Sequence, residues 1–414
     1  MTQLLPIQKA QEMILAALPQ PRVETCPIAA ACGRVLAEDV FSPLDLPPFD
    51  NSSMDGFAVC SAELTALPMR LPVSADIPAG ASQVAPLAAG SAARILTGAV
   101  MPPGADAVIP VEDTDAYAGP QNAALPDSVE IRTAVKAGAN VRRKGEDVRR
   151  GEPVLAKGQL LRPQDVGMLV SLGMSEVKVF KRARVALLSS GDELLEPGQP
   201  IVPGRIYDAN RFMLAGLLES AGAEVITPGI ARDTLADVTA KLEQACAAQP
   251  DLIVSSAGVS VGAFDYVREA VEARGSLSFW RVNMRPGKPI AFGEYRGIPF
   301  IGLPGNPVSA YIGCQVFVLP AVRQLHGRPP TQRRLVQALL DEPLRSADGR
   351  ESYYRGVVRR DGELWRGRLT GHQGSGNLLS LVQANALLIV PAGVAIIEAG
   401  QSVSAWLLDS DEPG

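Results

Sequence analysis

The stretch RVALLSSGDEL, residues 184–194, decides how the rest of the chain is interpreted. A run of apolar residues leads into a small polar turn, which is the pattern of a buried strand that ends beside a helix. Three similar units follow: AEVITPGIARD at 223–233, DLIVSSAGVSVG at 251–262 and IPFIGLPGNPVSA at 298–310. Repeated strand, turn and helix predict a central α/β domain with a mostly parallel sheet, whose turns gather at the carboxyl edge of the strands.

β-rich regions flank this α/β region on both sides. Residues 44–152 are dense in Pro, Gly, Ala and Val, with short β-type runs and little helical periodicity. After Gly327 the chain again alternates as short strands between Gly and Asp turns, which predicts a small C-terminal β-barrel or sandwich. Helical patterns at 6–18 and 162–172 enclose the first β-rich region, so we predict that this region is an insertion in a discontinuous domain.

These boundaries divide the multidomain chain into four parts. We predict a discontinuous N-terminal helical and linker domain at 1–22, 41–51 and 148–175, and a β-rich inserted domain at 23–40 and 52–147. The α/β domain is expected at 176–326 and the C-terminal β-barrel at 327–414.

Composition excludes several functional classes. The 39 Lys and Arg against 44 Asp and Glu leave a net charge of −5, so no general cationic field is available for nucleic acid or an anionic membrane. The N-terminus lacks the features of a signal peptide, and the apolar run at 310–322 is interrupted by Gln315 and Pro320. Five scattered cysteines and two histidines disfavour disulfides, structural zinc and histidine catalysis. We expect a soluble, cytoplasmic protein without nucleic-acid or membrane partners, whose chemistry rests on carboxylates.

The glycine-rich turns are candidate anion sites, because a turn between a strand and a helix presents backbone N–H groups. Each turn alone is explained equally well as an ordinary connection, but three in one sheet favour a binding site. The residues offered by the second and third turns are Gly258, Ser260, Gly262, Gly305, Asn306 and Ser309.

Acidic residues accompany these turns: Asp192 and Glu193 after the first strand, then Asp233 and Asp265. Each could simply cap a helix. Capping does not explain why carboxylates coincide with phosphate-type turns, since they repel an anion unless a hard cation lies between them. A Mg²⁺ ion bridging these acid side chains and the oxygens of the ligand would resolve that conflict.

Polar residues elsewhere extend the candidate site. Arg285 and Lys288 stand on the stiff turn MRPGKP, which favours phosphate contacts, although a solvated basic turn is an equal alternative. Asp55 lies in the loop PPFDNSSMDGFAV, where a plain Asx-turn cluster is the alternative. Thr97 in RILTGA and Asp147 in VRRKGEDVRRGE are further candidates, and for Asp147 pairing with the neighbouring arginines is a structural alternative.

Taken together, nine segments make the chain resemble the MoeA family of molybdopterin molybdenumtransferases and the related gephyrin E domain, from end to end. They are PPFDNSSMDGFA, RILTGAVMPPGADAVI, RRKGEDV, SSGDEL, IYDANRFML, SAGVSVGAFDY, MRPGKP, GLPGNPVSA and GHQGSGNLLSLVQANALLIVP. The resemblance implies a molybdopterin-binding α/β domain. It also implies a transferase that inserts molybdate into adenylylated molybdopterin with Mg²⁺-dependent release of AMP, the last step of molybdenum cofactor biosynthesis.

The resemblance also assigns roles to individual residues. The catalytic set is Asp55, Thr97, Asp147, Glu193, Asp233 and Asp265, of which Glu193, Asp233 and Asp265 would hold Mg²⁺. The residues expected to bind the pterin, its phosphate or the adenylate are Ser190, Gly191, Asp192, Asn210, Gly258, Ser260, Gly262, Arg285, Lys288, Pro304, Gly305, Asn306 and Ser309. The family implies a homodimer with active sites shared between subunits. Its expected partners are a molybdopterin adenylyltransferase and maturation proteins of molybdenum enzymes.

Two other classes of function compete with this interpretation. The gephyrin E domain clusters receptors, so a scaffold protein is one alternative, although the acidic set of a catalyst is intact. A general Mg²⁺-dependent nucleotide or sugar-phosphate hydrolase built on the same turns is the other alternative.

Overall fold

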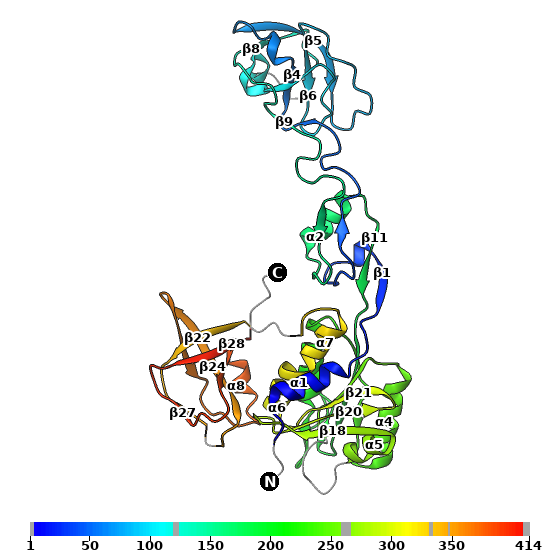
Figure 1. Cartoon of the computed structure of the whole chain (residues 1–414), viewed down its shortest axis with the longest axis vertical. Coiled ribbons are helices and arrows are strands. Elements are labelled where there is room, and N and C mark those ends of the chain that lie inside the picture. The colour runs from blue at the N-terminus through cyan, green and yellow to red at the C-terminus, as the bar shows by residue number, and fades with distance from the viewer. Residues whose placement is uncertain (1–3, 119–123, 258–265, 331–333, 347, 409–414) are drawn as a thin grey trace. The chain divides into compact units, whose positions relative to one another are not determined.

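The computed structural model describes residues 4–118, 124–257, 266–330, 334–346 and 348–408 (Figure 1). The chain divides into two compact units. The first consists of Met1–Ala37, Gly158–Arg162 and Glu176–Gly414, and the second of Glu38–Lys157 and Pro163–Ser175. This division is coarser than the four predicted domains, whose boundaries stay a prediction.

A seven-stranded sheet forms the centre of the first unit within the described residues. Its order is β15 (Glu224–Ile226), β12 (Arg184–Ser190), β17 (Leu252–Ser255), β21 (Ile298–Gly302), β20 (Pro289–Tyr295) and β18 (Gly275–Arg281), with β16 (Ile230–Ala231) also paired to β12. The strands pair in parallel except for β20, which runs antiparallel to both of its neighbours, β21 and β18. Arg296 and Gly297 both have positive φ, as a two-residue hairpin turn requires, so β20 and β21 run antiparallel. The predicted α/β domain with a mostly parallel sheet is confirmed.

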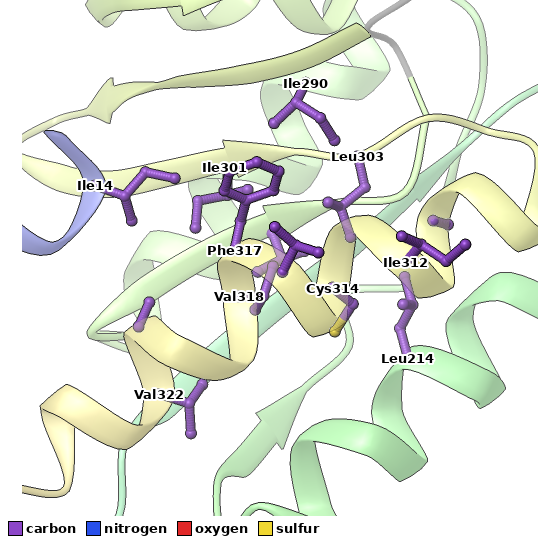
Figure 2. Close-up of a cluster of buried hydrophobic side chains, with 14 of the residues drawn as sticks. Ile14, Leu214, Ile290, Ile301, Leu303, Ile312, Cys314, Phe317, Val318 and Val322 are labelled. Atoms are coloured by element: carbon purple, nitrogen blue, oxygen red, sulfur yellow. The ribbon is translucent and has the colours of Figure 1, made fainter. Parts of the chain in front are cut away.

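Helices cover both faces of this sheet, because successive side chains of a strand point to opposite sides. In β12, Val185 and Leu187 enter one core, while Ala186 and Leu188 enter the other. The first core also receives α1 (Ile7–Ala16), α3 (Ala209–Ser220), α6 (Pro307–Gly313) and α7 (Leu319–Leu325), and Figure 2 shows part of it. The second core receives α4 (Leu235–Ala247) and α5 (Tyr266–Arg274).

The helical run from α6 to α7 is the most buried part of the first core. A π-helical turn at Cys314–Val318 connects the two helices, and Cys314 and Phe317 lie in the cluster of Figure 2. The run Pro307–Leu325 is longer than the apolar stretch noted in the sequence, and by length and composition alone it could span a membrane. However, 72% of an 18-residue window of this run is buried inside the protein, as in the core helix of a globular domain.

The C-terminal part of the first unit is a closed five-stranded barrel. Its strands are β22 (Leu335–Leu340), β24 (Glu351–Asp361), β25 (Leu364–Leu369), β26 (Ala386–Val390) and β28 (Ser402–Leu407). The order β24-β25-β22-β28-β26 closes because β24 also pairs with β26. The predicted barrel is therefore confirmed.

Strand β24 joins this barrel to the α/β domain. Tyr354 and Val358 point into the barrel core, whereas Tyr353 belongs to the core shared with the sheet helices. The short strand β19 (Met284–Arg285), which belongs to the MRPGKP turn, pairs with the start of β24. A turn of the α/β domain thus continues the sheet of the barrel.

Short elements complete the first unit. They are β1 (Val23–Pro27) paired with β11 (Glu176–Phe180), β13 (Leu194–Leu195) with β14 (Ile206–Tyr207), β23 (Leu344–Arg345) with β27 (Ile396–Ile397), and the helix α8 (Leu379–Val382). The β13–β14 pair fixes the chain that follows the SSGDEL turn.

The second unit is β-rich, as predicted. Its main sheet has the order β7 (Ala107–Pro110), β4 (Gly56–Val59), β6 (Ala92–Ile95), β5 (Met69–Ile77) and β8 (Ser128–Ile131). Smaller pairs are β3 (Asn51–Ser52) with β9 (Val141–Arg142) and β2 (Val40–Phe41) with β10 (Pro153–Leu155), and α2 (Pro163–Ser171) is its helix. Phe57 and Ala58 of β4 point into separate hydrophobic clusters, so side chains from both faces of the sheet are buried.

Candidate active site

The carboxyl ends of the parallel strands bring the predicted turns together along one edge. Ser189 lies near the end of β12, and Ser256 directly follows β17. Their hydroxyl groups lie 3.3 Å apart. The Leu303 N–H, directly after β21, donates to Ser255 at 2.7 Å, and the Gly191 N–H donates to Ala231 at 3.1 Å. Adjacent parallel strands that end at one level produce this arrangement.

The SSGDEL turn requires glycine at its sharpest point. Gly191 has φ +147°, and a Cβ atom added there would collide with the Glu193 carboxylate. The carboxylate of Glu193 therefore lies directly over the backbone at Gly191, next to the buried end of the strand at Ser190.

Asp192 and Asp233 form a reciprocal pair at this edge. The Asp192 N–H donates to Asp233 Oδ2 at 3.2 Å, and the Asp233 N–H approaches Asp192 Oδ1 at 3.4 Å. Helix α4 is capped by Thr234, whose hydroxyl accepts from the Asp237 N–H at 3.2 Å, so Asp233 does not serve as that cap. Asp192, Glu193 and Asp233 are exposed, and their carboxylates thus lie beside the same short stretch of backbone at the carboxyl end of β12.

The remaining members of the predicted metal and phosphate set cannot be placed. Gly258, Ser260, Gly262 and Asp265 lie outside the described residues. Among the residues that the structure describes, no group of three or more His, Cys, Asp or Glu side chains is arranged to hold a metal ion. The site with three carboxylate ligands stays a prediction.

Asn210 connects this edge to the turn that follows β21. Its side-chain Nδ2 donates to the Gly305 carbonyl at 2.7 Å. It stands in the first turn of α3, which Asp208 caps by accepting from the Arg211 N–H. Pro307 occupies the first turn of α6 and fixes the other side of the 303–310 turn.

Beyond this turn lies a cavity of 380 Å³ between the α/β domain and the barrel. Five of the residues predicted to bind the substrate line it: Arg285, Lys288, Pro304, Asn306 and Ser309. Its barrel-side residues include Arg350, Ser352, Arg355, Gln373 and Ser375. Arg285 and Lys288, although exposed, therefore line this cavity.

Arg355 is the most unusual residue of this cavity, because it is a charged residue only 1% exposed. Its Nε donates to the Ser380 hydroxyl at 2.9 Å and its Nη2 to the Gly374 carbonyl at 3.0 Å. Within the described residues it forms no salt bridge with a carboxylate. Burial lowers the pKa of Arg355 to about 10, so the group remains charged at neutral pH. A buried charge without a counter-ion is costly, and a cavity beside it suits an anion.

Gln373 fixes the backbone that carries this arginine. Its Oε1 accepts from the Arg355 N–H at 2.9 Å, and its Nε2 donates to the Arg355 carbonyl at 3.1 Å. Pairing between β24 and β25 begins only at Gly356, so the amide side chain supplies the missing strand partner.

The second unit carries the other three predicted catalytic residues. Asp55 Oδ1 accepts from the Thr97 N–H at 2.6 Å and from its hydroxyl at 2.7 Å, and these two donors hold the pKa of Asp55 below its usual value. Asp147 is exposed and, within the described residues, forms no salt bridge, because the nearby Arg143 pairs with Asp50 at 2.7 Å. The arrangement fits acids that are free to act on a ligand.

Comparison with known proteins agrees with this architecture. Residues 5–173 match the MoeA N-terminal region (domain I and II), residues 186–324 a probable molybdopterin binding domain, and residues 337–408 the MoeA C-terminal region (domain IV). Molybdopterin molybdenumtransferase 2 of Mycobacterium tuberculosis is 38% identical over 97% of this chain and 98% of its own length. The molybdopterin molybdenumtransferase of Haemophilus influenzae is 36% identical over the same shares of the two chains. The crystal structure of a MoeA protein from Pyrococcus horikoshii has a TM-score of 0.81 and 31% identity, covering 98% of this chain and 99% of the other.

The chain belongs to the MoeA family. Within that family it is a transferase of molybdenum cofactor biosynthesis, as the resemblance of its motifs predicted. The strand-edge turns fall in the region matched by the molybdopterin-binding domain, whereas Arg355 falls in the MoeA C-terminal region. Two regions of the family pattern thus contribute to one cavity.

Sequence reasoning missed the barrel side of this MoeA cavity. Arg350, Arg355, Gln373 and Ser375 were not assigned, although the segment GHQGSGNLLS was among the family motifs. The available signal was the period of two along YYRGVVRR: Arg355 shares its side of the strand with Tyr353, opposite the barrel core. An arginine between buried residues on such a strand needs a polar partner, and that expectation points to a binding cavity.

Proposed function

We propose that the chain transfers molybdenum from molybdate to adenylylated molybdopterin and releases AMP. The observation that carries this proposal is the buried Arg355, which has no carboxylate partner within the described residues and lines a cavity together with Lys288 and Ser309. A tetrahedral oxyanion supplies the missing negative charge and accepts hydrogen bonds from guanidinium, ammonium and hydroxyl donors.

The 304–309 turn would hold the pterin substrate next to this oxyanion. Pro304, Asn306 and Ser309 line the cavity, while Gly305 accepts from Asn210 at the strand edge. A pterin whose phosphate lies on the strand-edge turns would extend toward the cavity along this turn. The cavity of 380 Å³ leaves space for part of a pterin beside an oxyanion. Binding both reactants along one turn places them for transfer.

The exposed carboxylates at the strand edge fit a magnesium ion. Oxygen donors are the ligands that Mg²⁺ prefers, and Glu193 and Asp233 adjoin the same backbone at residues 191–192. These two residues would hold the ion together with the predicted Asp265. A bound Mg²⁺ would neutralise phosphate charge during release of AMP. Arg285 and Lys288 add positive charge on the cavity side.

Asp55, Thr97 and Asp147 would organise the reacting groups as part of a homodimer. Thr97 keeps Asp55 ionised and oriented through its two hydrogen bonds. If one copy supplies these acids and the other supplies the strand-edge turns, then Asp55→Asn and Glu193→Gln proteins, each impaired alone, regain activity when mixed and refolded together. Absence of recovery in mixed dimers, identified by light scattering, would refute shared sites.

The proposed setting is the cytoplasm, with a molybdopterin adenylyltransferase delivering substrate and maturation proteins receiving product. Chemical crosslinking of the purified chain with these two classes of partner tests this proposal. Capture that depends on adenylylated molybdopterin supports delivery, and capture that is equal without it contradicts delivery.

Release of AMP from adenylylated molybdopterin, with Mg²⁺ and with or without molybdate, tests the function. The proposal expects release that requires molybdate. A scaffold protein releases no AMP above background. A general phosphohydrolase releases AMP equally well without molybdate and also cleaves unrelated nucleotide pyrophosphates.

A further inference from the structure

The rim of the cavity carries a carboxylate that no predicted role explains. Asp348 precedes β24, and a single oxygen of its side chain, Oδ2, contacts two arginines that line the cavity. Arg350 pairs with this oxygen through Nε at 3.0 Å and through Nη2, and Arg285 approaches it through Nη1 at 3.5 Å. Arg285 comes from the α/β domain and Asp348 from the barrel, so the carboxylate lies where the two meet.

The two arginines are held very differently. Arg350 is also fixed by donating its Nη1 to the Met284 carbonyl at 3.1 Å, and its side chain is 21% exposed. The Arg285 side chain is 46% exposed, and its ion pair with Asp348 at 3.5 Å is long. An anion that enters the cavity therefore competes with Asp348 for Arg285, whereas Arg350 stays bound to Asp348.

The charges of the cavity also distinguish Asp348. The side chains that line the cavity include four cations, those of Arg285, Lys288, Arg350 and Arg355. Asp348 compensates two of them at the rim, and its interactions with Arg350 and Arg285 keep the pKa of its carboxyl below the usual value against the opposing effect of burial. The carboxylate is therefore ionised at neutral pH.

We infer that Asp348 is the resident counter-ion of the cavity, which competes with the bound oxyanion for Arg285 and so weakens its binding. The inference rests on the proposed oxyanion cavity. A site that must pass its oxyanion to a second substrate gains from this competition, because an anion held by four uncompensated cations would leave slowly. Asp348 thus tunes affinity and does not touch the reacting atoms.

Asp348→Asn tests this inference, because it removes the charge and keeps the size of the side chain. Asp361→Asn is the matched control: Asp361 is an exposed residue at the far end of β24, and the substitution changes the net charge equally. Six residues of extended strand separate it from Arg355, about 20 Å, which is beyond the screening length of physiological salt. Binding of molybdate alone is measured by calorimetry at two salt concentrations, with Arg355→Met locating the site.

The expected result is that Asp348→Asn binds molybdate about three- to tenfold more tightly than the unsubstituted protein, the size of one charge interaction in a partly solvated site. The gain shrinks at high salt, Asp361→Asn matches the unsubstituted protein, and Arg355→Met loses binding. Equal or weaker binding by Asp348→Asn overturns the counter-ion role and leaves the cavity standing. Tighter binding that persists in the double variant with Arg355→Met overturns it too, because the anion then binds elsewhere. If neither the unsubstituted protein nor Asp348→Asn binds molybdate, the inference fails, while the AMP-release assay still judges the proposed function separately.

Discussion

The strand edge and the basic cavity adjoin the same 304–309 turn, yet they are built in opposite ways. At the strand edge, exposed carboxylates are held by backbone groups, as in the reciprocal pair of Asp192 and Asp233. In the cavity, a buried guanidinium is held by a hydroxyl and a carbonyl, with no carboxylate partner within the described residues. Exposed acids retain their hydration until a cation arrives, whereas a buried cation is already desolvated and poised for an anion.

This difference indicates that the cavity and the strand edge control different steps of the reaction. Desolvated charge interacts strongly with a ligand, so the cavity should dominate affinity for the oxyanion. The acids at the strand edge should dominate the step that depends on magnesium. Substitutions on the two sides should therefore separate in their dependence on molybdate and on Mg²⁺.

The largest effect is expected from Arg355→Met, which removes the buried charge and keeps most of the volume. Loss of one preorganised donor to a developing or bound anion typically costs about 100- to 1,000-fold in rate, so molybdate-dependent AMP release should fall by that order. Arg359→Met, an exposed arginine of the same strand, is the control. Stability should not fall with activity, because removing an uncompensated buried charge is often neutral. Activity near that of the control would contradict an oxyanion role.

The buried His326 should make the stability of the fold depend on pH. His326 is 6% exposed, and its Nε2 accepts the Ala183 N–H at 2.8 Å. Burial, aided by Arg328 and other cations, lowers the pKa of His326 to about 4, below the 6.5 of the unfolded chain. The unfolded state therefore binds the proton first, so stability is complete above pH 6.5 and declines as the pH falls toward 4, by about 3 kcal/mol in all.

Urea unfolding of the protein and of His326→Gln between pH 7.5 and pH 4.5 measures this effect. The variant should lose much of the pH dependence in that window even if it is less stable throughout. An unchanged slope would show that other groups cause the acid sensitivity.

Glu193→Gln and Asp233→Asn should act through the metal and leave the cavity intact. We expect each to lower AMP release by roughly tenfold or more and to raise the Mg²⁺ concentration needed, because a ligand charge is lost. Binding of molybdate alone should be unchanged, and Glu219→Gln on an exposed part of α3 is the control. Normal Mg²⁺ dependence in both variants would refute the metal assignment.

The smallest effect is expected from Thr97→Val, which removes one of the two donors to Asp55. The backbone N–H at 97 remains, so Asp55 keeps its place but its lowered pKa should rise toward the usual value. A hydrogen bond to a charged group contributes about 1.5–3 kcal/mol, and partial exposure reduces this, so we expect a loss of a few-fold. Because the proposed role of Asp55 requires its anion, the acid limb of the pH–rate profile should move to higher pH. An unmoved limb would remove Asp55 from the rate-determining ionisation.

The sequence predicted the strand edge more completely than the cavity. Strand–turn–helix units are local signals, so the sheet, its carboxyl edge and the positions of Gly191 and Asn306 were predictable from short segments. The closed barrel was predictable only as an alternative to a sandwich, since closure depends on pairing between β24 and β26. Arg355 was not found because its burial arises from packing between the two domains, whereas the period of two along its strand indicates only which side of the strand it lies on.

The predictions on the second unit and on the turn at 258–265 have different support. Asp55 and Thr97 were chosen separately from their loops, and their hydrogen bond joins segments 42 positions apart in sequence. Gly258, Ser260, Gly262 and Asp265 lie outside the described residues, so their roles rest on sequence alone.

Strand β24 contributes to both the barrel core and the core of the α/β domain, which limits how the protein can be truncated. Tyr353, Leu387 and Trp406 lie on barrel strands yet complete the core around α1, α3 and α7. A chain cut after residue 326 would expose that apolar surface to water and would lack one wall of the anion cavity. Such a fragment would keep the acidic turns proposed to bind a nucleotide-type ligand. It would lack the oxyanion site and would tend to aggregate through its exposed apolar surface.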